Sequence, residues 1–136
     1  MGQQTLKVAE EVAESEFSRM CAAFRVDEDT SELDEKDLAE WNELRGAIVR
    51  DICRGLLVID PEGRPVYTPA GGKPITFNPP TGATIMALET YKDKQLSNTV
   101  AAMADMTQTN RGDFSRMPAR DFQACTRLAK LFLADQ

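Results

Sequence analysis

Histidine is absent from this chain of 136 residues. Its absence removes the commonest general base, the commonest transition-metal ligand and every nucleophile that imidazole activates. Catalysis would then need paired carboxylates, an activated lysine or a cofactor. The densest acidic run, Asp27 to Glu32, lies in a predicted linker between two helices, where nothing predicts burial. We therefore expect a protein that is not an enzyme and has no catalytic residues, no cofactor and no metal site.

The acidic run also departs from the pattern of a calcium-binding loop. Asp27, Asp29 and Ser31 occupy alternate positions between two predicted helices. However, Glu32 stands where such a loop needs glycine, and Leu38 stands where it needs a bidentate glutamate. The run predicts no more than weak, adventitious cation binding.

Cysteine is scarce, and its three positions, Cys21, Cys53 and Cys125, are far apart in the sequence. Each lies on an apolar stripe of a predicted helix, and an odd number of distant cysteines does not suggest a disulfide framework. Free cysteines in such stripes behave as small apolar core residues. We expect three buried, reduced and poorly reactive thiols, as in a cytoplasmic protein.

Long apolar runs are also missing. The longest uncharged stretch, Pro74 to Leu88, is interrupted by Asn78-Pro79-Pro80-Thr81-Gly82 and cannot form a membrane-spanning helix. Glu10 and Glu11 stand where a signal peptide would have its apolar region. The sequence predicts a soluble cytoplasmic protein that does not bind a membrane.

Basic residues are outnumbered, with 16 Lys and Arg against 22 Asp and Glu, for a net charge of -6. The imbalance is uneven, because residues 1–45 carry 13 acidic and 5 basic side chains and residues 46–136 carry 9 acidic and 11 basic ones. An acidic first third repels phosphate, so nucleic acid is not an expected partner. The opposite charges of the two parts favour self-association, although an acidic, solvated helix face is the alternative reading.

Proline and glycine are rare outside one window: six of seven prolines and five of eight glycines lie between Gly55 and Gly82. On both sides of this window, apolar residues recur at helical spacing. We predict one domain over 1–136, with two N-terminal helices and an acidic linker in 1–54, a turn-rich β segment in 55–82 and helices in 83–136. The fold class is α+β, helix-rich, with a small antiparallel sheet (a hairpin plus a short third strand) flanked by about five helices.

The first two helices are predicted over Gln4 to Phe24 and from about Leu33 to Gly55. Ser31 offers an N-cap for the second helix, with Asp34 three residues later, and Gly55 suits a left-handed C-cap. Gly46 inside that helix indicates the close approach of another element.

The β segment reads as a hairpin from Leu56 to Thr68 that turns at Asp60-Pro61-Glu62-Gly63, followed by a short strand at Pro74 to Phe77. Pro65 lacks an N–H donor, so the second strand is either an edge strand or starts there.

Three further helices are predicted after the β segment. Thr81 caps a helix that reaches Tyr91, and another helix covers Leu96 to Met106. Residues 110–113 break that helix, and a last helix starts near Pro118.

Methionine and tryptophan leave two interpretations open. Met86, Met103, Met106 and Met117 either form an adaptable binding surface, since the side chain is flexible and polarizable, or fill gaps in the core. Trp41 is either a core anchor or an interface anchor.

The second half of the chain resembles the tail assembly chaperones of long-tailed bacteriophages and prophages. The resemblance covers about Ile59 to Leu133 and is carried by Pro74-Ile75-Thr76-Phe77-Asn78-Pro79-Pro80-Thr81-Gly82-Ala83-Thr84-Ile85-Met86-Ala87-Leu88, Met117-Pro118-Ala119-Arg120-Asp121-Phe122 and Leu131-Phe132-Leu133. In that family a strand leads through a Pro-Thr-Gly turn to a helix, and an apolar helix closes the chain. The two N-terminal helices lie outside the pattern.

The resemblance implies a non-enzymatic protein that oligomerises, coats the helical tape-measure protein and recruits tail-tube subunits. Flexible methionines beside aromatic anchors suit such a partner, so the expected partner-binding residues are Met103, Met106, Phe122, Leu128 and Phe132. The same residues could instead form plain core. The alternative function is a structural phage subunit, a connector or baseplate adaptor, that is retained in the virion.

Overall fold

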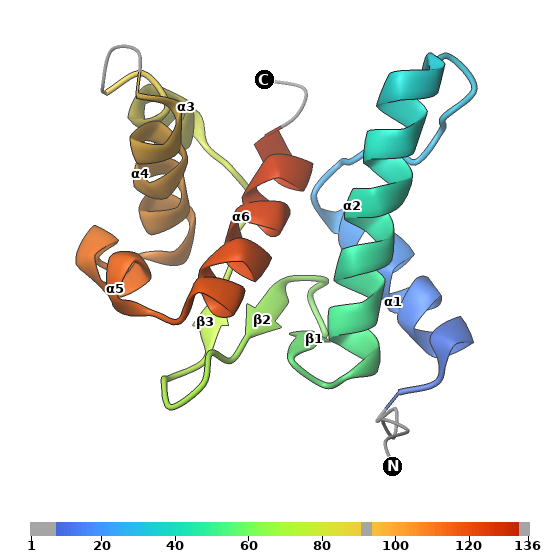
Figure 1. Ribbon diagram of the computed structural model, residues 1–136, viewed down its shortest axis with the longest axis horizontal. Coiled ribbons are helices and arrows are strands. Elements are labelled where there is room, and N and C mark those ends of the chain that lie inside the picture. Colours follow the sequence, from blue (N-terminus) through green and yellow to red (C-terminus); the bar gives the residue numbers. More distant parts are fainter. Residues whose placement is uncertain (1–7, 91–93, 134–136) are drawn as a thin grey trace. The chain divides into compact units, whose positions relative to one another are not determined.

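The computed structural model describes residues 8–90 and 94–133, and the chain divides into two compact units, Met1–Pro65 (unit 1) and Val66–Gln136 (unit 2). The described part contains six helices and three short strands (Figure 1). The strands form one antiparallel sheet in the order β1-β2-β3, which confirms the helix-rich α+β class. Whether the two units unfold as the single expected domain stays a prediction.

Unit 1 contains α1 (Glu10–Ala23), α2 (Glu35–Cys53) and β1 (Leu57–Ile59). The apolar stripes of the two helices face inward and bury, among others, Phe17, Met20 and Ile48. Trp41 stacks edge-on against Phe17 with ring centroids 6.3 Å apart, so it contributes to packing within this unit while remaining partly exposed.

The hairpin after β1 is fixed by a close approach and by hydrogen bonds. Gly63 has φ +85°, and a Cβ at this position would lie 2.6 Å from the Cβ of Ala23 at the end of α1. The Arg19 guanidinium donates to the carbonyls of Asp60 and Ile59 at 2.6 and 3.0 Å. The expected left-handed glycine turn is therefore confirmed, and α1 holds it in place.

The side chain of Asp60, the first residue of this turn, accepts several of the hydrogen bonds that hold the turn together. Its carboxylate accepts from the backbone N–H and the side chain of Arg64, at 2.8 Å each, and from the N–H of Glu62 at 2.9 Å. Partial burial acts to raise the pKa of Asp60, but these hydrogen bonds outweigh it and hold the pKa below its ordinary value. The ionised carboxylate therefore stabilises the turn.

Unit 2 holds most of β2 (Pro65–Tyr67), then β3 (Ile75–Thr76), α3 (Gly82–Ala87), α4 (Gln95–Thr107), α5 (Arg111–Arg116) and α6 (Ala119–Leu133). β2 and β3 pair antiparallel, with Val66 opposite Thr76 and Tyr67 opposite Ile75. Helix α4 packs against α3, α5 and α6. The largest side chains of this core include Tyr67, Phe77 and Phe114.

Several local expectations are corrected. The N-cap of α2 is Asp34, which accepts from the Asp37 N–H at 2.8 Å, and not Ser31. A methyl group added at Gly46 would meet only the end of the Arg50 side chain, at 3.6 Å, so this glycine does not mark close packing. The helix expected over Leu96 to Met106 does end before residues 110–113, since α4 stops at Thr107, but a short helix that was not expected, α5, starts at Arg111.

Other boundaries agree with the sequence patterns. Gly55 has φ +77° directly after α2, as a left-handed cap requires, and Pro65 stands at the first position of β2. Two helix ends differ from the prediction. The helix expected from Gln4 starts only at Glu10, since Val8 and Ala9 are not helical, and positions 4–7 lie outside the described residues. The helix expected to reach Tyr91 ends at Ala87, and Tyr91 itself lies outside the described residues.

Candidate functional site

Four of the five expected partner-binding residues lie in the core. Met103, Met106, Leu128 and Phe132 are at most 4% exposed, whereas Phe122 is partly exposed. This burial agrees with the alternative in which these four residues form plain core, because α4 and α6 pack against each other and cover their apolar stripes. A periodic stripe has the same sequence whether a partner or a neighbouring helix covers it. Their role in partner binding stays a prediction, and in this conformation only Phe122 is accessible for it.

An apolar groove lies beside Phe122, where α4, α5 and the start of α6 meet. Its volume is about 550 Å³. Five large apolar side chains line it, together with one arginine and small residues; the large side chains are Leu96, Val100, Phe114, Met117 and Phe122. Leu96 is 61% exposed, the second most exposed large apolar side chain in the described part of the chain after Met86. We call this site the apolar groove.

The local sequence explains how the groove is shaped. The stripe of α4 divides along its length, since Met103 and Met106 point into the core while Leu96 and Val100 lie nearer the surface. Phe114, which is fully buried, anchors the short α5 and forms the floor. Met117 is extended, with ψ 157°, as expected for a residue that precedes proline, and the chain then enters α6 at Ala119. Residues 111–119 thus form one wall.

A buried carboxylate fixes the start of α6 next to the groove. Asp121 is 6% exposed, accepts from the Tyr67 hydroxyl at 2.6 Å and accepts from the Ala70 N–H at 3.1 Å. Its position in the first turn also places a negative charge at the positive end of the helix dipole. This network ties Phe122, the next residue, to the β2–β3 connection.

Helix α4 is held at two further points. Thr84, on α3, is fully buried and donates to a carboxylate oxygen of Asp105 at 2.5 Å. Asn78 donates from both its backbone N–H and its side-chain amide to the Met106 carbonyl, at 3.0 and 2.9 Å. The described buried side chains leave no nitrogen or oxygen without a hydrogen-bond partner. These hydrogen bonds fix the C-terminal half of α4 within unit 2.

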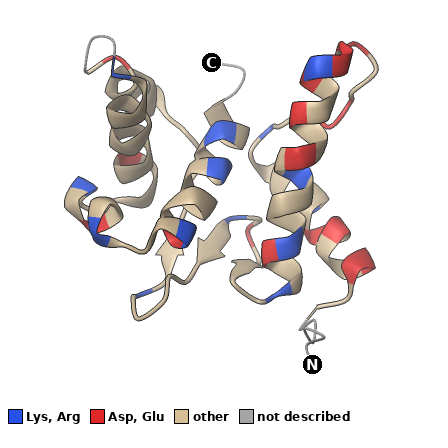
Figure 2. Cartoon of the chain, in the orientation of Figure 1, with Lys and Arg blue, Asp and Glu red and all other residues tan. Residues whose placement is uncertain are grey.

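The wall formed by α5 and the start of α6 is positively charged. Arg111 lines the groove, and residues 111–120 contain three arginines against one aspartate. That aspartate, Asp113, pairs with Arg116 at 2.9 Å. Figure 2 shows these basic positions on α5 and at the start of α6. Of the three arginines, Arg111 is the one that lines the groove, and the other large lining side chains are apolar, so a ligand of the groove should be mainly apolar.

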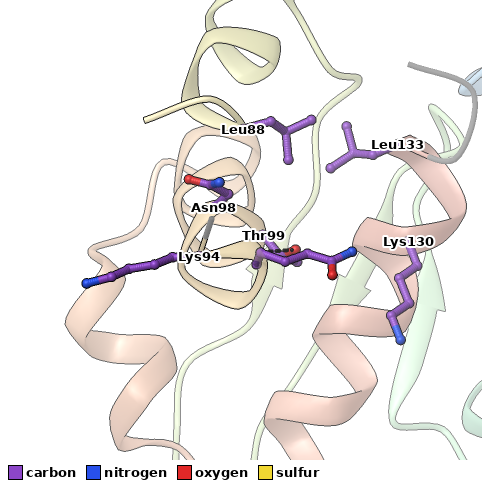
Figure 3. Close-up of a pocket in the computed structure, with 7 residues that line it drawn as sticks. Leu88, Lys94, Asn98, Thr99, Lys130 and Leu133 are labelled. Carbon is purple, nitrogen blue, oxygen red and sulfur yellow. Dashed lines mark hydrogen bonds between the residues drawn. The ribbon is translucent and has the colours of Figure 1, made fainter. Parts of the chain in front are cut away.

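A second pocket, of about 590 Å³, lies between α4 and the end of α6. In Figure 3 the side chains of Leu88 and Leu133 point toward one another, while Lys94 extends away from them. Leu133 and Lys94 directly adjoin positions 134–136 and 91–93, which are outside the described residues. This pocket carries no functional assignment.

The cysteines are all buried and free, as expected. Burial, followed by the nearby charge of Glu28, raises the pKa of the Cys21 thiol to about 12, so this thiol stays protonated and unreactive at neutral pH. Across residues 8–90 and 94–133, no three Cys, Asp or Glu side chains come together as metal ligands would. None of the helices described here has both the length and the apolar character needed to cross a membrane.

Comparison with known proteins adds no relative. No protein-family model matches the chain, and neither the curated proteins nor the solved structures contain a match.

The sequence contained part of the signal for the groove. Leu96 and Val100 belong to the apolar stripe of their helix, and Met117 stands out among the clustered methionines. The sequence did not reveal that α5 forms and brings Arg111 and Phe114 against that stripe. The sequence signal for α5 is a short segment that contains one aromatic residue, Phe114, and lies between Asn110 and Pro118.

Proposed function

We propose that this protein is a tail assembly chaperone of a long-tailed bacteriophage or prophage. It oligomerises in the host cytoplasm and binds the tape-measure and tail-tube proteins during tail morphogenesis, without catalysing a reaction. The observation that carries the proposal is the apolar groove, which supports it together with the resemblance of residues 59–133 to that family.

The chemistry of the groove suits a helical client. Helix-in-groove recognition requires an apolar channel and few fixed polar contacts, and the large groove-lining side chains are all apolar apart from Arg111. Met117 adds a flexible, polarizable side chain that adapts to imperfectly repeated partners. A long helical tape-measure protein presents many related apolar segments rather than one fixed epitope.

Co-purification tests the proposal. The tagged protein is co-expressed with the tape-measure protein, and separately with the tail-tube protein, of the genome that encodes it. Leu96→Ser combined with Met117→Ser (the groove double variant) should abolish capture of the tape-measure protein, because both changes remove exposed apolar area from the groove. The matched control is Met86→Ser, since Met86 is 74% exposed but lies outside the groove. Equal capture by all three proteins would exclude the groove as the client site.

Two further observations separate this function from its alternative. A tube-protein gene before this gene and a very long helical reading frame after it would support the chaperone. Detection of the protein in purified, mature particles would instead indicate a retained connector or baseplate adaptor.

A further inference from the structure

The apolar stripe of α2 is buried over only part of the helix. Its large apolar residues recur at a spacing of three or four positions: Leu38, Trp41, Leu44, Ile48 and Ile52. All buried residues of this helix lie within residues 47–53. The first three members of the stripe keep part of their surface exposed. We call Leu38, Trp41 and Leu44 the α2 stripe. The first half of α2 therefore presents an amphipathic face that the described part of the chain covers only partly.

The α2 stripe has the size and the residue types of a docking surface for a helix. Leu38 and Leu44 are six positions apart, which corresponds to about 9 Å, or nearly two turns. Trp41 lies between them, and its edge-on contact with Phe17 fixes the ring while part of it stays accessible. Leu33, which is 38% exposed, directly precedes the N-cap, a position from which a residue often packs against the fourth helical residue, here Leu38. Tryptophan is enriched among the residues that contribute most to protein–protein binding.

Exposed carboxylates border the α2 stripe. Glu35, Asp37 and Glu40 each precede a member of the stripe by three or four positions, so they are its neighbours on the helix surface. Within residues 8–90 and 94–133, none of these three carboxylates takes part in an ion pair or a hydrogen bond. Residues 27–43 contain nine acidic residues and one lysine, and Figure 2 shows acidic positions along the first half of α2. The rim of the stripe therefore carries negative charge that no cation of the described chain pairs with.

We propose that the α2 stripe binds a basic amphipathic helix of another protein. The apolar side of that helix packs against Leu38, Trp41 and Leu44, as side-chain ridges of one helix fit the grooves of another. Its lysine and arginine side chains lie opposite the free carboxylates, which steer the encounter and fix the orientation of the partner. The same negative charge disfavours nucleic acid as an occupant. The inference does not rest on the proposed function, because the stripe belongs to unit 1 and the apolar groove belongs to unit 2.

A synthetic peptide probes the contact on the full-length protein. The probe is a helix of about 15 residues with leucine at every third or fourth position and lysine elsewhere. It contains no tryptophan, so the fluorescence reports only on Trp41, the single tryptophan of the chain. One control peptide has glutamate in place of lysine, and another has the composition of the probe but scattered leucines that form no stripe. The probe should shift the Trp41 emission saturably, and both controls should bind at least about tenfold more weakly.

Two matched pairs of variants locate the probe. Leu38→Ser should weaken its binding about tenfold, whereas Val58→Ser should bind it like the wild type, because Val58 is 57% exposed in the same unit but lies on β1. Asp37→Asn combined with Glu40→Gln should weaken binding several-fold at about 0.1 M salt and less at about 1 M, since the Debye length falls from about 10 Å to about 3 Å. The control with the same charge change removes the two exposed carboxylates in the first turn of α1, Glu10→Gln with Glu11→Gln, and should bind within about twofold of the wild type. Circular dichroism checks that every variant is folded.

Four results would overturn the proposal. Equal binding of the probe and the scattered-leucine peptide would mean that charge alone attracts the peptide. Equal binding by Leu38→Ser and Val58→Ser would exclude the α2 stripe as the site. Loss of the probe in the groove double variant, but not in Leu38→Ser, would place the peptide in the apolar groove. Sedimentation velocity in which the wild type self-associates and Leu38→Ser does not would assign the stripe to a second copy of the chain.

Discussion

Met103→Ala should lower the stability of the protein, whereas Leu96→Ala should weaken client binding and leave the stability nearly unchanged, although both residues belong to the apolar stripe of α4. Met103 is fully buried and Leu96 is 61% exposed. Truncation of a buried methionine costs about 2–5 kcal/mol through lost apolar contacts and the cavity that remains. Truncation at an exposed helical position usually changes the free energy of unfolding by no more than about 0.5 kcal/mol.

The larger cost is a substantial part of the total stability, which for a small protein is about 5–15 kcal/mol. For a chain of this size, 1 kcal/mol corresponds to roughly 3–6 °C in melting temperature, so Met103→Ala should melt roughly 6 °C or more below the wild type. Leu96→Ala should melt within about 3 °C of it and should bind the client more weakly.

Circular dichroism at 222 nm, which follows the helices of both units, measures these shifts. The chain has a single tryptophan, Trp41, whose fluorescence reports on unit 1. If the two units form one cooperative domain, Met103→Ala should lower both transitions together. A separate, unshifted fluorescence transition would show that the units unfold independently. If Met103→Ala melts with the wild type, or if Leu96→Ala melts as early as Met103→Ala should, then Met103 is not buried or Leu96 is not exposed as described.

Three other changes test the contacts that position the fold and the groove. Gly63→Ala should destabilise the protein by about 2 kcal/mol or more, because φ is +85° and the new methyl would lie 2.6 Å from the Cβ of Ala23; an unchanged urea midpoint would contradict the close approach. Tyr67→Phe should cost about 1–3 kcal/mol by removing a hydrogen bond from the buried Asp121 carboxylate, and urea unfolding measures this loss. The folded-state pKa of Asp60 lies below the ordinary 3.8, so its stabilising effect is present above that pH and is lost as the pH falls through the lower folded value. The difference in free energy of unfolding between the wild type and Asp60→Asn should therefore shrink between about pH 5 and pH 2. A difference that stays constant over this range would exclude the role of the ionised carboxylate.

The sequence by itself determined the local structure wherever one residue type satisfies a local requirement. Gly55 and Gly63 adopt the left-handed conformations predicted for them, and Pro65 starts a strand where its missing donor is tolerated. The helical periodicities on both sides of residues 55–82 gave the helix-rich α+β class, and the apolar stripes placed all three cysteines inside. These features depend on backbone sterics and on local apolar spacing, which the sequence records directly.

Only the tertiary structure decided which apolar side chains remain accessible. The stripe of α4 reads alike from Leu96 to Met106, yet α6 covers Met103 and Met106 and leaves Leu96 exposed. The apolar groove exists because a helix that was not expected, α5, forms after α4 ends and brings Phe114 and Arg111 against α4. Burial depends on neighbours that are distant in sequence, so periodicity identifies an apolar face but does not specify what covers it.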